Sequence, residues 1–161
     1  DEPFDLVYAR FLLTHLARPG DLLAALRRRL RPGGVVVVED VDFRGHFAEP
    51  ACPALERYVA LYSRCVRARG ADPEIGPKLP GLLRDAGYED VRMRLVQPAG
   101  RGARVKRLAS VTLESISDAV LREGLASEEE LAETIRELDA FARDPRTILG
   151  GPRVFQAWAR A

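Results

Sequence analysis

A chain of 161 residues is long enough for one domain with a hydrophobic core of its own. Hydrophobic residues make up 47% of the sequence and charged residues 30%, which excludes a globally disordered chain. The 25 basic residues nearly balance the 24 acidic ones, and the net charge of +1 argues against nucleic acid or an anionic membrane as a partner. We therefore expect a globular protein of another class.

The cysteines and histidines do not form a metal motif. Cys52 and Cys65 lack the spacing of a zinc site, and His15 and His46 lie far apart in the sequence. Two thiols in a chain of this length are typical of a reducing compartment, so a cytoplasmic location is expected. We expect no signal peptide, and no apolar run in the sequence reaches the roughly 18 residues of a membrane helix. We expect no metal and no membrane partner.

The first half of the chain has the pattern of a β-α-β unit. Residues 4–9 (FDLVYA) predict a short strand, and residues 10–16 predict a turn or a short helix. A longer helix follows, with Pro19 near its first position. A four-residue spacing of Leu22, Leu26 and Leu30 predicts its apolar face. Leu23 widens this face.

Four consecutive valines, residues 35–38, predict a parallel strand that is covered on both faces. Pro32 and the two glycines after it end the preceding helix. In open α/β sheets, ligands bind beyond the carboxyl ends of the strands. Residues 8–11 and 39–43 follow the two predicted strands, so we expect them to lie side by side and to form the binding site.

The second half alternates predicted helices with short strands. We expect helices at residues 54–69, 79–86, 105–123 and 127–143, and strands at residues 91–96 and 154–159. Ser127 and Glu130 have the spacing of a capping box at the start of the last helix. Residues 144–152 are predicted to be a linker. Residues 97–107 are predicted to be a loop with a solvated basic face, made by Arg101, Arg104, Lys106 and Arg107.

Several segments, in this order, resemble a known family: FDLVYARFLLTHL, LLAALRRRLRPGGVVVVED, LLRDAGYEDVRM and VFQAWARA. They are similar to the middle and end of class I S-adenosylmethionine-dependent methyltransferases of the small-molecule type. The resemblance implies an α/β fold with a partial Rossmann-like sheet, made of the family's last four strands with the final strand antiparallel. Residues 1–161 would then be one incomplete domain, and residues 48–70 and 105–143 helical insertions that could form a substrate lid.

The sequence departs from the family pattern at the cofactor site. The family's glycine-rich loop and the acidic residue that ends its second strand are absent, and these hold the amino-acid end and the ribose of the cofactor. We therefore expect the chain alone to bind S-adenosylmethionine weakly or not at all. Gly100-x-Gly102 is not a substitute, because it lacks a third glycine and Pro98 interrupts the tight turn that such a loop needs.

Two functions remain open. The resemblance implies methyl transfer from S-adenosylmethionine to a small-molecule acceptor, with this chain a truncated portion that is weakly active or inactive. The alternative is a non-catalytic half-domain that dimerises or binds a partner, because an unpaired strand edge at residues 4–9 is a template for pairing. We expect a homodimer or a companion N-terminal fragment.

The strand ends and the resemblance together give the candidate site residues. Those expected at the cofactor are Tyr8, Ala9, Arg10 and Phe11. Those expected at the substrate are Glu39, Asp40, Asp42, Phe43 and His46.

Some of these residues have a structural alternative. His15 is the catalytic candidate, because a histidine can take a proton from a hydroxyl or amine near neutral pH. It could equally be a helix-start histidine that packs locally. Arg10 could anchor a carboxylate of the ligand, or could pair with Asp40 or Asp42 across the strand ends. The strand-end carboxylates of Glu39, Asp40 and Asp42 could orient a polar substrate or serve as a base. They could equally cap the next segment or pair with Arg10 and Arg44.

Overall fold

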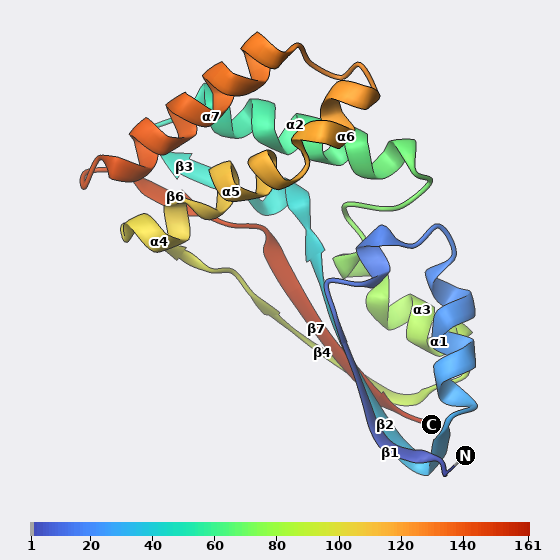
Figure 1. Ribbon diagram of the computed structural model, residues 1–161. Helices are drawn as coiled ribbons and strands as arrows, with labels where there is room; N and C mark the ends of the chain where they lie inside the picture. Colours follow the sequence, from blue (N-terminus) through green and yellow to red (C-terminus); the bar gives the residue numbers. More distant parts are fainter. Residues whose placement is uncertain (1) are drawn as a thin grey trace. The chain divides into compact units, whose positions relative to one another are not determined.

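The computed structural model describes residues 2–161, and the chain divides into two compact units (Figure 1). The first unit consists of residues 2–42, 70–96 and 154–161. The second unit consists of residues 43–69 and 97–153. Each unit has its own helices and its own sheet, and each is described by itself.

The first unit is built on a four-stranded sheet with the order β1-β2-β7-β4. Its strands are β1 (Phe4–Arg10), β2 (Leu30–Asp42), β4 (Glu89–Val96) and β7 (Arg153–Arg160). β1 is parallel to β2, and β4 is antiparallel to β7. The amide of Ala161 donates to the carbonyl of Gly34, so the end of β7 lies at the start of β2 and the two strands run in opposite directions. The predicted α/β sheet of four strands, with the last one antiparallel between its neighbours, is therefore confirmed.

Two helices of the first unit lie on the same face of this sheet, α1 (Pro19–Arg27) and α3 (Leu79–Asp85), and they pack against each other (Figure 1). Short 3-10 helices precede them: η1 (Leu13–His15) and η3 (Gly76–Lys78). Pro19 stands at the start of α1, as predicted. The core under the helices contains the buried residues Leu13, Leu23, Val36, Val38, Leu79, Leu83 and Ala157. Burial of each large side chain of this core contributes about 1.5–3 kcal/mol.

The opposite face of the sheet is open, so the prediction that the valines are covered on both faces is wrong. Val36 and Val38 are fully buried, but Val35 and Val37 are only half-buried. Leu6 and Tyr8 of β1 lie beside them in the parallel register and are exposed. The reason is that α1 and α3 both pack on one side. The apolar face of α1 also differs from the prediction. Leu23 rather than Leu22 is the fully buried leucine of α1, and Leu30 already belongs to β2.

The second unit is mainly helical. It contains η2 (Phe43–Gly45), α2 (Pro53–Ala68), α4 (Ala103–Lys106), α5 (Leu108–Ser115), α6 (Ser117–Arg122) and α7 (Glu128–Arg143). A small antiparallel sheet of order β3-β6-β5 completes it, made of β3 (Phe47–Glu49), β5 (Ala99–Gly100) and β6 (Ile148–Gly150). α2 packs against α5, α6 and α7 (Figure 1). The capping box of Ser127 and Glu130 is present at the start of α7, as predicted.

Three predictions for the second unit are wrong. The expected linker at residues 144–152 contains β6, which pairs with β3 and β5. The expected helix at residues 105–123 is broken into three. Ser115 and Ser117 donate to carbonyls four residues earlier, a hydrogen bond that competes with regular helix geometry. Lys106 does not belong to a solvated face: it is fully buried, and its ammonium donates to the carbonyl of Asp144 and the hydroxyl of Thr147.

Candidate functional site

The carboxyl ends of β1 and β2 lie side by side, as the valine strand predicted. Their register places Tyr8 beside Val37, Ala9 beside Val38 and Arg10 beside Glu39. Two of the segments chosen from the sequence, residues 8–11 and 39–42, therefore meet at one end of the sheet. This is the end at which open α/β sheets bind their ligands.

A charged network closes this end of the sheet. The Arg10 guanidinium lies 3.4 Å from the carboxylate of Glu39, which also accepts a hydrogen bond of 2.6 Å from Gln156 on β7. Arg10 thus pairs with Glu39, one of the pairings considered for the strand-end carboxylates, and not with Asp40 or Asp42. The Arg10 side chain is still 57% exposed, so it can reach a ligand without leaving the sheet edge.

Phe11 follows Arg10 in a left-handed backbone conformation, with a φ of 50°. Its amide donates to the carbonyl of Glu39, and the Arg10 guanidinium lies 4.7 Å from the centre of its ring. A bulky residue rarely adopts this conformation, and such residues gather at functional sites. The Phe11 ring and the neighbouring Leu12 remain exposed, so this turn presents an apolar surface at the end of β1.

Asp40 faces the opposite side of β2, where it is fully buried. Its carboxylate accepts hydrogen bonds of 3.0 Å from the backbone amides of Thr14 and Val41. Burial raises the pKa of Asp40, and the bonds from these amides oppose that rise. Asp40 therefore fixes η1 against the end of β2. Asp42 is also buried, and it is not without an interaction partner.

His15 ends η1 and its side chain is exposed. Its backbone amide donates to the carbonyl of Leu12. His15 therefore differs from the alternative considered for it, a helix-start histidine that packs locally. Its charge acts on Asp40, whose pKa it lowers slightly. The part of the chain that the structure describes holds no side-chain hydrogen bond that would orient the imidazole of His15.

The remaining two candidates, Phe43 and His46, belong to an aromatic cluster of the second unit. Phe43 stacks on Tyr62 with the ring centres 3.8 Å apart, and the His46 ring is in contact with Phe43 and Tyr58. Sequence reasoning did not select Tyr58. The available signal was its four-residue spacing from Tyr62, which places both rings on one face of a helix.

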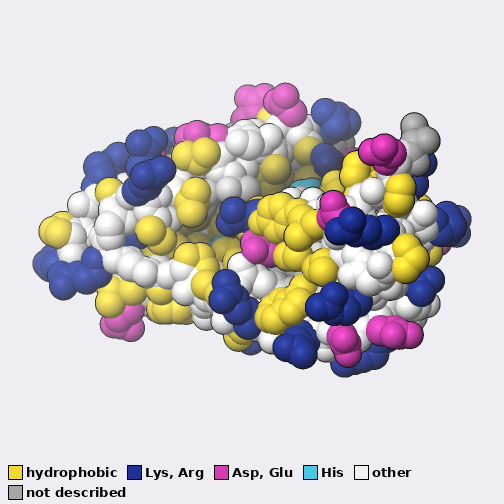
Figure 2. Space-filling model, turned by 90° about the horizontal axis from the view of Figure 1, so that it is seen from below, with side chains coloured by type: hydrophobic (Ala, Val, Ile, Leu, Met, Phe, Trp, Pro, Cys, Tyr) yellow, Lys and Arg dark blue, Asp and Glu magenta, His cyan; other side chains and the backbone are white. Residues whose placement is uncertain are grey.

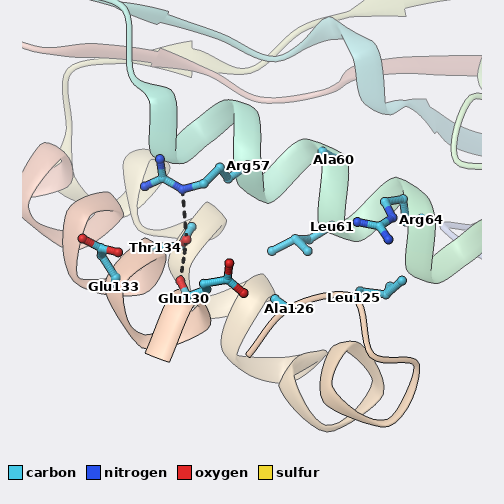
Figure 3. A pocket seen from close by; sticks show the side chains of 9 residues that line it. All are labelled: Arg57, Ala60, Leu61, Arg64, Leu125, Ala126, Glu130, Glu133 and Thr134. Carbon is cyan, nitrogen blue, oxygen red and sulfur yellow. Dashed lines mark hydrogen bonds between the residues drawn. The ribbon is translucent and has the colours of Figure 1, made fainter. Parts of the chain in front are cut away.

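The second unit also has a hollow of about 360 Å³ between α2 and α7. Figure 3 shows its lining, in which Arg57 donates to Thr134 and Thr134 donates to the carbonyl of Glu130. The remaining lining residues are Ala60, Leu61, Arg64, Leu125, Ala126 and Glu133. Two guanidinium groups and two carboxylates line the same hollow, so its charge favours neither an anion nor a cation.

Among residues 2–161, no group of three or more His, Cys, Asp or Glu side chains is placed to hold a metal ion. No helix in the same range is long and apolar enough to cross a membrane. On the face drawn in Figure 2, basic and acidic side chains are interspersed with hydrophobic ones. This agrees with the nearly balanced charge of the sequence.

A family model described as a methyltransferase domain matches residues 1–93. The match covers more than half of the chain and includes both β1 and β2. The chain belongs to the methyltransferase domain family. The resemblance stated from the sequence motifs is therefore confirmed, and S-adenosylmethionine, the cofactor it implied, agrees with the membership.

Two curated methyltransferases are similar to part of this chain. Methyltransferase str3 of Strobilurus tenacellus is 27% identical over 128 residues, which cover 76% of this chain and 46% of the relative. Phosphoethanolamine N-methyltransferase 1 of Arabidopsis thaliana is 29% identical over 91 residues, which cover 56% of this chain and 16% of the relative. The chain thus spans less than half the length of these relatives.

Solved structures share the fold. A protein of Bacillus halodurans C-125 assigned as a methyltransferase superposes with a TM-score of 0.53 at 16% identity, over 99% of this chain and 65% of that protein. Mycolic acid cyclopropane synthase CmaA1, solved with SAH and CTAB, superposes with a TM-score of 0.52 at 19% identity, over 100% of this chain and 56% of that one. At these identities the likeness concerns the fold alone.

Proposed function

We propose that this chain forms part of an enzyme that transfers a methyl group from S-adenosylmethionine to a small-molecule acceptor. The observation that carries the proposal is the register of β1 and β2, which brings Arg10 and Phe11 beside Glu39 at the carboxyl end of the sheet. Both strands lie within the matched methyltransferase domain. The names of the curated relatives support the same reaction.

The residues present fit one side of the cofactor. Tyr8 and Phe11 offer exposed aromatic rings at β1, Ala9 is buried in the core between them, and Arg10 can reach a carboxylate. The neighbouring carboxylates are already engaged, since Glu39 bonds Arg10 and Gln156 while Asp40 holds two backbone amides. We infer that this chain contributes a wall of the cofactor site, and that groups elsewhere hold the ribose and the amino-acid end.

S-adenosylmethionine, when bound, supplies an already activated methyl group. The protein then contributes proximity, alignment and exclusion of water. In our proposal, Tyr8, Ala9, Arg10 and Phe11 position the donor. The acceptor residues expected from the sequence are divided: Glu39, Asp40 and Asp42 belong to the end of β2 in the first unit, and Phe43 and His46 belong to the second unit. Of these, Glu39 lies beside Arg10 and is the one that we propose for positioning the acceptor. We propose His15, whose side chain is exposed at the end of η1, as the catalytic candidate.

Calorimetric titration with S-adenosylhomocysteine tests the proposal. Micromolar binding by this chain alone would indicate a complete cofactor site, and no binding, restored by an N-terminal fragment, would indicate an incomplete domain. In whichever form binds, Phe11→Ala should weaken binding several-fold, because an aromatic contact is lost. Val111→Ala removes an exposed apolar side chain of α5 and serves as the matched control. The absence of binding in both forms would refute the function.

We also propose that the edge strand β1 pairs with another chain segment, either in a second copy or in a companion N-terminal fragment. β1 is an edge of the sheet, and three of its apolar side chains are about half exposed: Phe4, Leu6 and Tyr8. An apolar strand edge of this kind is a template for pairing.

Sedimentation velocity tests this second proposal. Leu6→Lys should reduce self-association, because it puts a charge on the exposed face of the edge strand. Leu108→Lys changes an equally exposed leucine of α5 and should leave it unchanged. A monomer that neither associates with itself nor binds an N-terminal fragment would contradict the pairing.

A further inference from the structure

A row of polar side chains crosses the open face of the sheet in the first unit. One residue comes from each strand: Arg10 on β1, Glu39 on β2, Gln156 on β7 and Arg94 on β4. Their sequence neighbours Val38 and Ala157 are buried in the core under α1 and α3. Successive side chains of a strand point to opposite faces of the sheet, so the row lies on the face that the two helices leave uncovered.

Each member of this row contacts the next one. Nε of Arg10 lies 3.4 Å from Oε2 of Glu39, and Nε2 of Gln156 donates to Oε1 of the same carboxylate at 2.6 Å. At its other end, the Gln156 amide accepts through Oε1 a hydrogen bond from Nε of Arg94. The contacts therefore run without interruption from β1 to β4.

The two partners of Gln156 give its amide a single orientation. A carboxylate can only accept hydrogen bonds, and a guanidinium group can only donate them. Turning the amide over would place its oxygen against Glu39 and its NH₂ group against Arg94, and both hydrogen bonds would be lost. Arg94 therefore determines which end of the Gln156 side chain faces Glu39.

Arg10 is held at two places and is free at a third. Its Nε faces Glu39, and its guanidinium carbon lies 4.7 Å from the centre of the Phe11 ring. Among residues 2–161, its two terminal nitrogens have no polar partner, and the side chain is exposed. Two such nitrogens can bind the oxygens of a carboxylate or a phosphate side by side.

We propose that Gln156 and Arg94 are positioning residues, which act through Glu39 to hold Arg10 in place for the methyl donor. This inference rests on the proposed methyl transfer, in which Arg10 helps to position that donor. Gln156 occupies one oxygen of the carboxylate and leaves the other to Arg10, so the guanidinium is presented in one arrangement. A side chain that is ordered before its ligand arrives loses less entropy when the ligand binds.

The position of Arg94 separates this role from a general effect of its charge. Neighbouring strands lie about 4.8 Å apart, so the order of the strands puts the backbone of β4 roughly 14 Å from that of β1. Exposed charges are largely screened beyond about 8 Å at physiological ionic strength. Removal of the charge of Arg94 should therefore affect Arg10 through the row of contacts and hardly through space.

Arg92 is the matched control for Arg94. It lies two residues away on β4, so its side chain points to the same face of the sheet, and it is likewise exposed. Among the described residues, it has no polar contact with Gln156 or with any other side chain. Arg92→Met thus removes the same charge from the same strand and leaves the row intact.

Nitrogen-15 NMR of the arginine Nε groups in this chain gives the first test. We expect Gln156→Met and Arg94→Met each to shift the Nε–H signal of Arg10 and to speed its exchange with water. Arg92→Met should leave both unchanged. A signal of Arg10 that neither Gln156→Met nor Arg94→Met moves would overturn the positioning role. This measurement needs no ligand.

Calorimetric titration with S-adenosylhomocysteine, in whichever form of the protein binds it, gives the second test. Gln156→Met should raise the Kd roughly 3- to 10-fold, and Arg94→Met should raise it by a smaller factor. The double variant should bind no more weakly than Gln156→Met alone, because both substitutions interrupt the same row. Additive losses, or an equal loss in Arg92→Met, would overturn the proposal.

An exchange of the two central residues tests the row without changing its volume. Gln156→Glu brings two carboxylates face to face and should weaken binding. Adding Glu39→Gln restores every contact: the new amide accepts from Arg10 and donates to the new carboxylate, which still accepts from Arg94. Binding should therefore recover in the double variant. A double variant that binds no better than Gln156→Glu would overturn the role of the row.

The positioning role and the proposed function can fail separately. A wild-type protein that binds S-adenosylhomocysteine in neither form would refute the methyl transfer, and with it the role of the row. Normal binding that neither Gln156→Met nor Arg94→Met weakens would overturn the positioning role alone.

Discussion

Replacing Asp40 by alanine should destabilise the first unit by about 2–4 kcal/mol. Asp40 is fully buried, and its two carboxylate oxygens each accept a bond of 3.0 Å from a backbone amide, those of Thr14 and Val41. The substitution leaves both amides without an acceptor, at about 1–3 kcal/mol each. Burying the carboxylate is itself unfavourable, which is why its pKa is raised. Removing it therefore offsets part of this cost.

Urea unfolding followed by the fluorescence of Trp158, the only tryptophan, measures this loss on β7 of the same unit. Asp40→Asn keeps one acceptor oxygen and should cost about half as much. Asp85→Ala, at the exposed end of α3, should change stability by less than about 0.5 kcal/mol. A loss below about 0.5 kcal/mol for Asp40→Ala, or equal losses for alanine and asparagine, would refute the view that this carboxylate holds η1 to β2.

Thermal unfolding should reveal three further effects. Lys106→Met removes a buried ammonium that donates to two acceptors, so it should destabilise the protein by about 2–4 kcal/mol. Arg104→Met, at an exposed position, should cost little. Equal shifts of the unfolding midpoint in the two variants would contradict a stabilising role for the buried Lys106. Ser127→Ala removes the N-cap of α7 and should cost about 1 kcal/mol, and a neutral result would count against the capping box. Gly76→Ala would bring a methyl group within 2.6 Å of the Phe155 ring and should cost about 1–3 kcal/mol; an unshifted midpoint would show that the ring yields freely.

Local patterns predicted much of the candidate site. The parallel pairing of the strand at residues 4–9 with the valine strand follows from a β-α-β pattern, because strands joined in this way are usually neighbours in the sheet, and the register confirms it. The capping box at Ser127 was equally predictable, because it depends on two residues three positions apart. The partner of Arg10 could not be predicted, because Glu39, Asp40 and Asp42 are equivalent in a linear sequence. Only the direction of each side chain from the strand separates them.

The sequence by itself determined the β-α-β unit and the segments that meet at the end of the sheet, because hydrophobic periodicity and turn residues act over a few neighbours along the chain. The family and the order of the strands followed from the resemblance of its motifs to a known family. The tertiary structure decided which groups are buried, paired or open. It enclosed Lys106 in a unit where the sequence suggested solvent, and it left one face of the valine strand uncovered. These properties depend on contacts between residues that are distant in sequence, and no local pattern encodes them.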